Sequence, residues 1–215
     1  MTKSFGEEQH PMRDLQGYLD GEKVKRILAE AAQTNPAHYV FLLTMACTGR
    51  RVSEVLELRP CDISFEDKNI AWHIKKKKDK NAMQVHPANA WVLDELAALL
   101  RREIMMGSSQ ERVFKFTRQH GDKFFKRYCA AVGINRVGTK PPHLHHLRHS
   151  FAINYLKANP DNSGAIRQLQ QALAHSDIRI TSGYLQYSSE DRRKSQDNLT
   201  QMYKKAEEEP KEAQQ

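Results

Sequence analysis

The sequence predicts an α+β fold, mostly helical, with one small antiparallel β-sheet. Two observations lead to this prediction. Apolar residues recur at helical spacing on both sides of a middle segment, and residues 63–85 of that segment alternate and favour β-branched and aromatic side chains. Because 215 residues make one domain of ordinary size, we expect a single domain at 18–203, a flexible lead-in at 1–17 and a disordered charged tail at 204–215.

Start and stop signals define the helices before the sheet. Asp20 is a plausible N-cap for a first amphipathic helix, which Asn35-Pro36 ends. Residues 37–47 are nearly all apolar and lead into Thr48-Gly49, which predicts a buried helix with a glycine stop. A short third helix is expected before Arg59-Pro60.

The rest of the predicted elements follow from changes in period. Alternation and turn residues predict three strands, at 63–65, 70–74 and 82–85. Helical spacing then returns in four segments, around 91–100, 124–128, 147–155 and 166–173. Glycine and proline between 135 and 142 predict a loop.

The charge balance favours a polyanionic partner. The net charge is +8, with ten histidines besides, so nucleic acid is the first expectation. No apolar run approaches the roughly 18 residues of a membrane span, so we expect no membrane association. The start has no apolar signal region and three cysteines cannot all pair, which favours a reducing, cytoplasmic location.

Two arginines follow the predicted buried helix directly. The simplest interpretation of Arg50-Arg51 is a surface pair. Alternatively, an arginine this close to a packed element needs a partner for its charge, and Ser53-Glu54 comes directly after it.

A histidine and an arginine share one face of a later helix. His145 and Arg148 are three positions apart, so both can point at one oxyanion. This spacing alone is weak, because His10 and Arg13 repeat it in the predicted lead-in, where we interpret it as a chance match.

A run of lysines lies in the predicted hairpin between the second and third strands. Such a run is usually a solvated face, but at a hairpin tip it can also follow a DNA backbone and bring one ammonium near a scissile phosphate. These lysines are Lys75, Lys76, Lys77, Lys78 and Lys80.

Near the end of the predicted domain, His175 closes a short helix and Tyr184 follows it. A lone tyrosine is usually a core residue or a half-buried surface ring, and Tyr187 offers the same side chain. Only the joint pattern of these motifs gives Tyr184 a chemical role.

Taken in order, these motifs resemble the catalytic domain of the tyrosine recombinases, the phage integrase family, over about residues 18–187. The motifs are Thr48-Gly49-Arg50-Arg51-Val52-Ser53-Glu54, the lysine hairpin, His145-x-x-Arg148-His149, Leu173-Ala174-His175-Ser176 and Tyr184. The resemblance implies that the residues surrounding the reacting phosphate are Arg51, Lys78, His145, Arg148 and His175, with Tyr184 as the nucleophile. Glu54 would orient Arg51, the other lysines would bind DNA, and Lys77 is the alternative to Lys78.

The resemblance also implies an activity. It is that of a site-specific DNA recombinase, which breaks and rejoins strands through a 3′-phosphotyrosine intermediate without a metal ion or ATP. Family likeness implies a homotetramer on two paired double-stranded DNA sites. A helix capped by Ser189-Glu190-Asp191 has only Leu199 and Met202 as strong apolar anchors, so we expect it to dock on a neighbouring protomer.

Two details depart from the family pattern. Ala174 replaces the usual glycine before the histidine, which adds one methyl group. Family members usually carry a helical DNA-clamping domain first, whereas only about 17 residues precede the first predicted helix. We therefore expect either an excised catalytic domain or a naturally short member.

Three other functions remain as alternatives. A type IB topoisomerase shares the tyrosine and the cationic site but relaxes supercoils without pairing two sites. A catalytically silent DNA-binding module would bind DNA through the net positive charge and would not cleave it. A zinc site would need ligands from His143, His145, His146, His149 and Cys129, but no Cys-x-x-Cys pair supports it.

Overall fold

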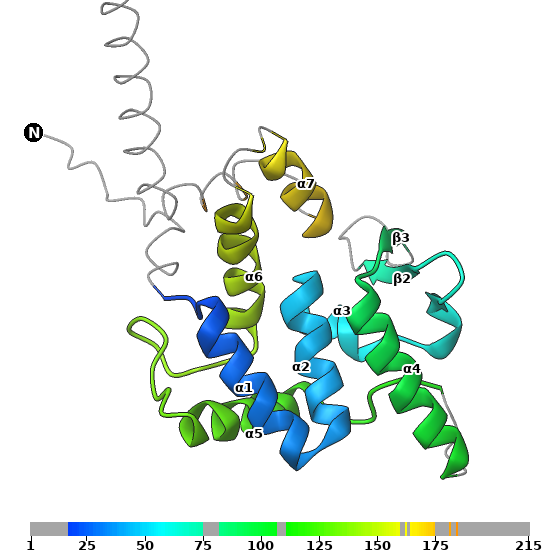
Figure 1. The fold of residues 1–215 in the computed structure, drawn as a ribbon, viewed down its shortest axis with the longest axis horizontal. Coiled ribbons are helices and arrows are strands. Elements are labelled where there is room, and N and C mark those ends of the chain that lie inside the picture. The colour runs from blue at the N-terminus through cyan, green and yellow to red at the C-terminus, as the bar shows by residue number, and fades with distance from the viewer. Residues whose placement is uncertain are drawn as a thin grey trace, which may run out of the picture.

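The computed structural model describes residues 17–74, 82–106, 111–159, 162, 164–174, 181 and 184. Figure 1 shows that this part of the chain is mostly helical, with one small sheet at the side. The elements are α1 (Gly21–Thr34), α2 (Pro36–Thr48), α3 (Val52–Leu56), the 3-10 turn η2 (Pro60–Asp62), β1 (Ile63–Ser64), β2 (Asn69–Ile74), β3 (Ala82–Pro87), α4 (Ala90–Met105), α5 (Arg118–Ala131), α6 (His145–Ala158) and α7 (Ala165–Ala172). The predicted fold class is confirmed.

Helices α1 and α2 begin and end where the sequence signals predict. The Asp20 carboxylate accepts a hydrogen bond from the backbone N–H of Lys23 at 2.9 Å and caps α1. Gly49 ends α2 with φ 63°, in the left-handed region that favours glycine. A Cβ at Gly49 would lie 2.3 Å from the ring of Phe151, so space as well as conformation requires glycine at this corner.

The three strands form one antiparallel sheet in the order β1-β2-β3. Ile63 of β1 pairs with Ile70 of β2, and Trp72 of β2 pairs with Gln84 of β3. Alternate residues of β2 are buried, whereas β3 has no buried residue, as expected for a half-buried antiparallel sheet. The lysine segment between β2 and β3 lies outside the described residues.

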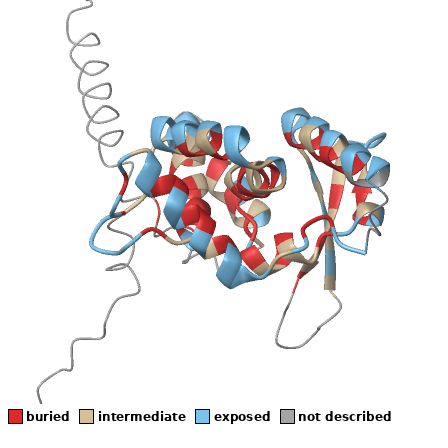
Figure 2. Ribbon diagram, turned by 90° about the horizontal axis from the view of Figure 1, so that it is seen from below, coloured by how far each residue is buried: buried red, intermediate tan, exposed pale blue. Residues whose placement is uncertain are grey.

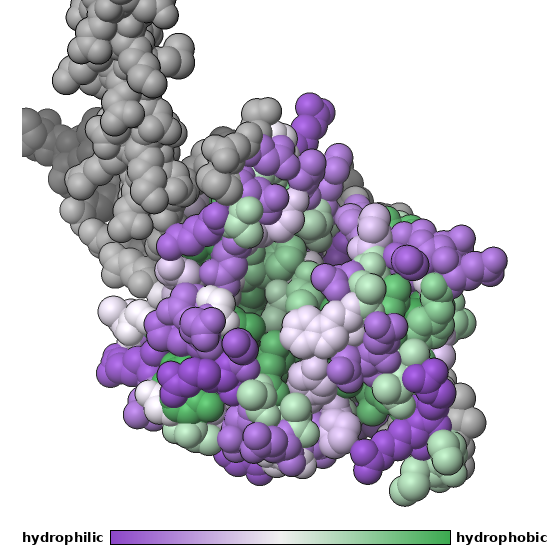
Figure 3. Space-filling model, in the orientation of Figure 1, coloured by the Kyte–Doolittle hydropathy of each residue, from purple (hydrophilic) through white to green (hydrophobic). Residues whose placement is uncertain are grey.

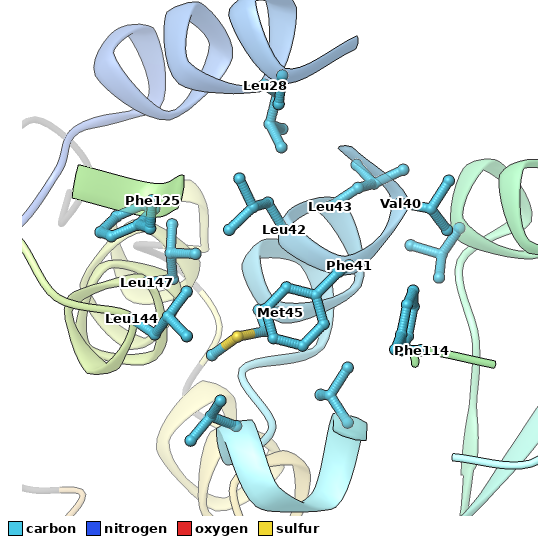
Figure 4. Packing of buried hydrophobic residues seen from close by; sticks show 14 of the residues in the cluster. Leu28, Val40, Phe41, Leu42, Leu43, Met45, Phe114, Phe125, Leu144 and Leu147 are labelled. Carbon is cyan, nitrogen blue, oxygen red and sulfur yellow. The ribbon is translucent and has the colours of Figure 1, made fainter. Parts of the chain in front are cut away.

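The core is built around α2. Residues 40–45 of this helix are all buried, which confirms the buried helix expected from the apolar run. Figure 4 shows its side chains packed against residues of other elements, among them Leu28 of α1, Phe125 of α5 and Leu147 of α6. In Figure 2 buried residues accordingly lie on the inward faces of the helices. Because α2 packs against α1, α4 and α6, its end at Gly49 has a fixed position.

A smaller hydrophobic cluster lies between α6 and α7. It contains Ala152, Ile153, Leu156, Ala165, Leu169, Leu173 and Tyr184. The start of the described chain is tied to α6, because the backbone N–H of Leu19 donates to Ser150 Oγ at 2.8 Å. Leu19 is buried although the sequence gives it no helical or strand signal.

Part of the surface is apolar. A groove lined mostly by apolar residues of α1, α2 and α4, including Val24, Ala29 and Trp91, runs along the face seen in Figure 3, where hydrophobic residues show between hydrophilic ones. Among the described helices, none combines the length and apolar character needed to cross a bilayer.

One partly buried histidine links the core to α5. The His38 ring stacks on Phe124, with ring centroids 3.8 Å apart, and its Nδ1 lies 2.8 Å from the Tyr128 hydroxyl. Burial, followed by the charges of His120 and Arg127, lowers the pKa of His38 from 6.5 to about 4. His38 is therefore neutral in the folded chain at neutral pH.

We expect the folded chain to lose stability as the pH falls from 6.5 to about 4. In this range the unfolded chain binds a proton at position 38 that the folded chain does not, so acid favours unfolding. Because solvent screens this partly exposed ring, the single difference lowers the free energy of unfolding at pH 4 by on the order of 1 kcal/mol. His38→Phe should keep the stack on Phe124 and reduce this loss, as measured by urea unfolding at pH 8 and pH 4.5. Equal losses in the two proteins would contradict the assignment.

Candidate active site

The first group of the site is an ion pair at the start of α3. The Glu54 carboxylate accepts hydrogen bonds from the backbone N–H of Arg51 at 3.1 Å and from Arg51 Nη1 at 2.9 Å. The side chain of Glu54 is 2% exposed, whereas that of Arg51 is 43% exposed. A buried carboxylate thus holds a guanidinium that reaches the surface, as expected if Glu54 orients Arg51.

The second group is the guanidinium of Arg148 on α6, which is 2% exposed. Its Nη1 donates to the Gly49 carbonyl and its Nη2 to the Leu173 carbonyl, both at 2.7 Å. These bonds join the end of α2 and the end of α7 to α6. Burial, with the nearby charge of Arg51 next, lowers the pKa of Arg148 to about 10, so it stays protonated at neutral pH.

The third group is the phenol of Tyr184. Its hydroxyl lies 3.0 Å from Nδ1 of His149 on α6. Tyr184 is 4% exposed and packs in the smaller hydrophobic cluster, and its phenolate would interact electrostatically with Arg148. The tyrosine is therefore sheltered, with its hydroxyl oxygen against His149 and in electrostatic interaction with Arg148.

His145 lies beside His149 on the same helix face. The two ring centroids are 4.5 Å apart in an edge-on arrangement. The His145 residue is exposed, but desolvation of its ring by the surrounding protein, followed by the charges of His149 and Arg148, lowers its pKa from 6.5 to about 4. At neutral pH His145 therefore offers one donor and one acceptor nitrogen rather than a positive charge.

The structure brings the predicted residues Arg51, Glu54, His145, Arg148 and Tyr184 to one region of the molecule. The interactions of Arg148 with Arg51, Glu54 and Tyr184, and of His145 with Arg148, connect them. The other predicted site residues lie outside the described part of the chain, namely Lys75, Lys76, Lys77, Lys78, Lys80 and His175. The same holds for the helix expected after Ser189 and for the tail at 204–215.

The sequence alone assigns no role to His149 and predicts Arg50 at the surface. The place of His149 one turn after His145 nevertheless puts it on the same face. The interpretation of Arg50-Arg51 as a surface pair is wrong for Arg50, which is 1% exposed. The corner at Gly49 turns one of the two neighbouring side chains inward, and no local signal distinguishes them.

The departure from the family pattern at position 174 has a structural consequence. Ala174 has φ 51°, in the left-handed region that residues with a Cβ rarely adopt. A glycine there would be free of this strain, so the extra methyl group is less favourable than its small size suggests.

The histidine-rich segment does not form the alternative zinc site in the part of the chain that the structure describes. No group of three or more histidine, cysteine, aspartate or glutamate side chains is arranged there to hold a metal ion. The His146 ring instead accepts a hydrogen bond at Nδ1 from the backbone N–H of His143 at 3.1 Å, and burial raises the pKa of the Cys129 thiol to about 12.

Known proteins resemble this chain in sequence. The model of the phage integrase family matches residues 17–191. Tyrosine recombinase XerA of Thermococcus onnurineus is 30% identical over 194 residues, which cover 86% of this chain and 63% of that protein. The chain thus spans a little under two thirds of the length of this curated relative.

Solved structures resemble it in fold. The crystal structure of XerA recombinase superposes with a TM-score of 0.65 at 24% identity, over 78% of this chain and 57% of that one. A lambda integrase tetramer bound to a Holliday junction gives a TM-score of 0.58 at 19% identity, over 78% of this chain and 47% of that one. These structures show a shared fold, and the family match over residues 17–191 establishes that the chain belongs to the phage integrase family, the tyrosine recombinases.

Proposed function

We propose that this chain is the catalytic part of a site-specific DNA recombinase that acts through a 3′-phosphotyrosine. One observation carries the proposal most directly. The Tyr184 hydroxyl meets His149 on the helix that also holds Arg148, while Arg51 reaches the surface nearby. A nucleophile, a base and two permanent cations thus lie together, which is the set that phosphodiester attack requires.

The arginines act on the charge of the reacting phosphate. A phosphodiester is anionic, and charge on its oxygens grows as a nucleophile attacks. Fixed donors placed there stabilise the transition state more than the ground state. Arg51 and Arg148 suit this role because a guanidinium keeps its proton at neutral pH and offers a forked set of donors. Neutral His145 adds one donor to the phosphate without further charge.

The covalent step starts from the sheltered phenol. His149 Nδ1 accepts the proton of the Tyr184 hydroxyl as the phenolic oxygen bonds to phosphorus. The bond from phosphorus to the 5′ oxygen breaks, and that oxygen takes a proton, for which Lys78 is our candidate donor and His175 an assisting group. A 5′-hydroxyl then attacks the phosphotyrosine and releases the phenol. One phosphoester replaces another at each step, so neither ATP nor a metal ion is required.

We propose that the working assembly is a homotetramer on two paired double-stranded DNA sites. Four strand exchanges need four tyrosines, and the similar fold of the lambda integrase tetramer on a Holliday junction supports this arrangement. The expected helix after Ser189, with Leu199 and Met202 as anchors, is the proposed contact to the neighbouring protomer. Monomeric sedimentation on cognate DNA would count against it. A DNA substrate agrees with the cytoplasmic location expected from the sequence.

Two alternatives differ in measurable ways. A type IB topoisomerase-like enzyme would relax any supercoiled plasmid without site dependence. A silent DNA-binding module would retard DNA in gels and never form a covalent adduct. The contact between Tyr184 and His149 favours an active enzyme over the silent module.

The nucleophile is tested with a nicked suicide duplex that carries the cognate site. The unsubstituted chain should accumulate a covalent adduct, seen as a shifted band on a denaturing gel. Tyr184→Phe should give no adduct while binding the duplex with unchanged affinity, because it removes only the hydroxyl. Tyr187→Phe is the matched control and should cleave normally. Adduct formation by the Tyr184 variant would remove this residue from the reaction.

The role of His149 as the base is tested with a substrate that distinguishes the loss of the base from the loss of the acid. His149→Gln should slow cleavage by about 10²–10⁴-fold, because the phenol loses the group that takes its proton. A duplex with sulfur in place of the leaving 5′ oxygen needs no acid. It should therefore restore cleavage by Lys78→Ala and leave His149→Gln slow. Equal rescue of the two variants would contradict the role of His149 as the base.

The orienting carboxylate is tested by Glu54→Gln, which keeps the shape and removes the charge. Arg51 should lose its fixed position, and misplacement of this kind costs about 10²-fold in rate. Glu22→Gln on the exposed face of α1 is the control and should cleave normally. Single-turnover cleavage rates of the two variants, with circular dichroism to verify folding, provide the comparison. An unchanged rate in Glu54→Gln would show that Arg51 does not depend on this carboxylate.

A further inference from the structure

Arg50 is a buried cation without a partner for its terminal nitrogens. The side chain is 1% exposed, and among the described residues neither Nη1 nor Nη2 has a hydrogen-bond acceptor. Burial lowers the pKa of Arg50 to about 10, so the group is still protonated at neutral pH. Buried donors are nearly always hydrogen-bonded in native proteins, so this exception calls for an explanation.

A cavity of about 400 Å³ has Arg50 among its lining residues. Its lining comes from the end of α2, from the β2–β3 sheet and from α6 and α7, and Figure 1 shows α7 and the sheet on neighbouring sides of the molecule. The polar side chains of the lining include Thr48, Arg50, His86, Gln168 and Gln171. None of the described lining residues is acidic.

Neighbouring groups do not neutralise Arg50. Among the described residues, the carboxylate whose charge acts on it is Glu54, which bonds Arg51 through both oxygens. The guanidinium carbon of Arg50 lies 5.3 Å from the ring centre of Trp72, so an aromatic face supports the cation but provides no acceptor for its N–H groups. Burial, followed by the charge of Arg50, lowers the pKa of His86 to about 4, so His86 is neutral here. The cavity is therefore positive, and none of the described residues that line it accepts a hydrogen bond from Nη1 or Nη2 of Arg50.

We propose that this cavity binds a small oxyanion, a carboxylate or a phosphate group, that accepts hydrogen bonds from Nη1 and Nη2 of Arg50. A guanidinium presents parallel N–H groups that match two oxygens of such an anion. The two nitrogens have almost no exposed surface, so the anion must displace part of the wall, where Gln168 and Gln171 are exposed side chains of α7. The site is separate from the reacting phosphate proposed at Arg51.

The test uses Trp72 as an internal reporter. Trp72 lines the cavity, and Trp91 is the other of the two tryptophans, so Trp91→Phe leaves Trp72 as the only tryptophan. Inorganic phosphate and malonate are titrated separately into the full chain, with sodium chloride adjusted to constant ionic strength. We expect a saturable change in fluorescence with at least one of them, and the active anion identifies the ligand class.

Variants locate the binding. Arg50→Met should weaken binding at least tenfold, whereas Arg51→Gln and the surface control Arg167→Met should bind as before. Ala172→Leu narrows the cavity from α7 while Arg50 itself stays unsubstituted, and it should also weaken binding, which keeps the test valid if Arg50→Met does not fold.

Three results would overturn the proposal. They are no saturable change with either anion, unchanged binding in Arg50→Met and Ala172→Leu, or loss of binding in Arg51→Gln alone. The last result would place the anion at the proposed catalytic phosphate site. None of these results bears on adduct formation at Tyr184 by the unsubstituted chain, so the two proposals fail independently.

Discussion

The hydrogen bonds from buried Arg148 to two backbone carbonyls are the contact on which the proposed site depends. They join Gly49 and Leu173, which are 99 and 25 positions away from Arg148 along the chain. A buried charge is tolerated when it is hydrogen-bonded. The two carbonyl groups accept hydrogen bonds from Arg148, but they are neutral and therefore do not cancel its positive charge. The positive field therefore persists at the point where the ends of α2 and α7 meet α6, and an anion there gains from it.

The rest of the site depends on how α6 is held. His149 and His145 lie one turn apart on this helix, and Tyr184 is brought to them by the small hydrophobic cluster between α6 and α7. The same cluster keeps the phenol away from water in the free protein. The ring of Tyr184 thus packs in the apolar cluster while its hydroxyl contacts His149, and the proposed activation acts through the hydroxyl alone.

Much of this arrangement follows from local sequence signals. The apolar run before Gly49 predicts the buried helix α2, alternation predicts β2, and the spacing of His145 and Arg148 predicts a shared face. Contacts between distant segments carry no such signal. The bond between Leu19 and Ser150 spans 131 positions. The inward turn of Arg50 likewise depends on tertiary packing, because either of two adjacent arginines fits the local pattern equally well.

The most direct test of the central claim is a crystal structure of the chain on a nicked duplex that carries its site. The account predicts one DNA phosphate in hydrogen-bond contact with Arg51 and within the field of Arg148, with the Tyr184 hydroxyl in line with the bond to the leaving oxygen. A phosphate bound elsewhere, with Tyr184 and Arg51 on surfaces that no neighbouring protomer unites, would contradict it.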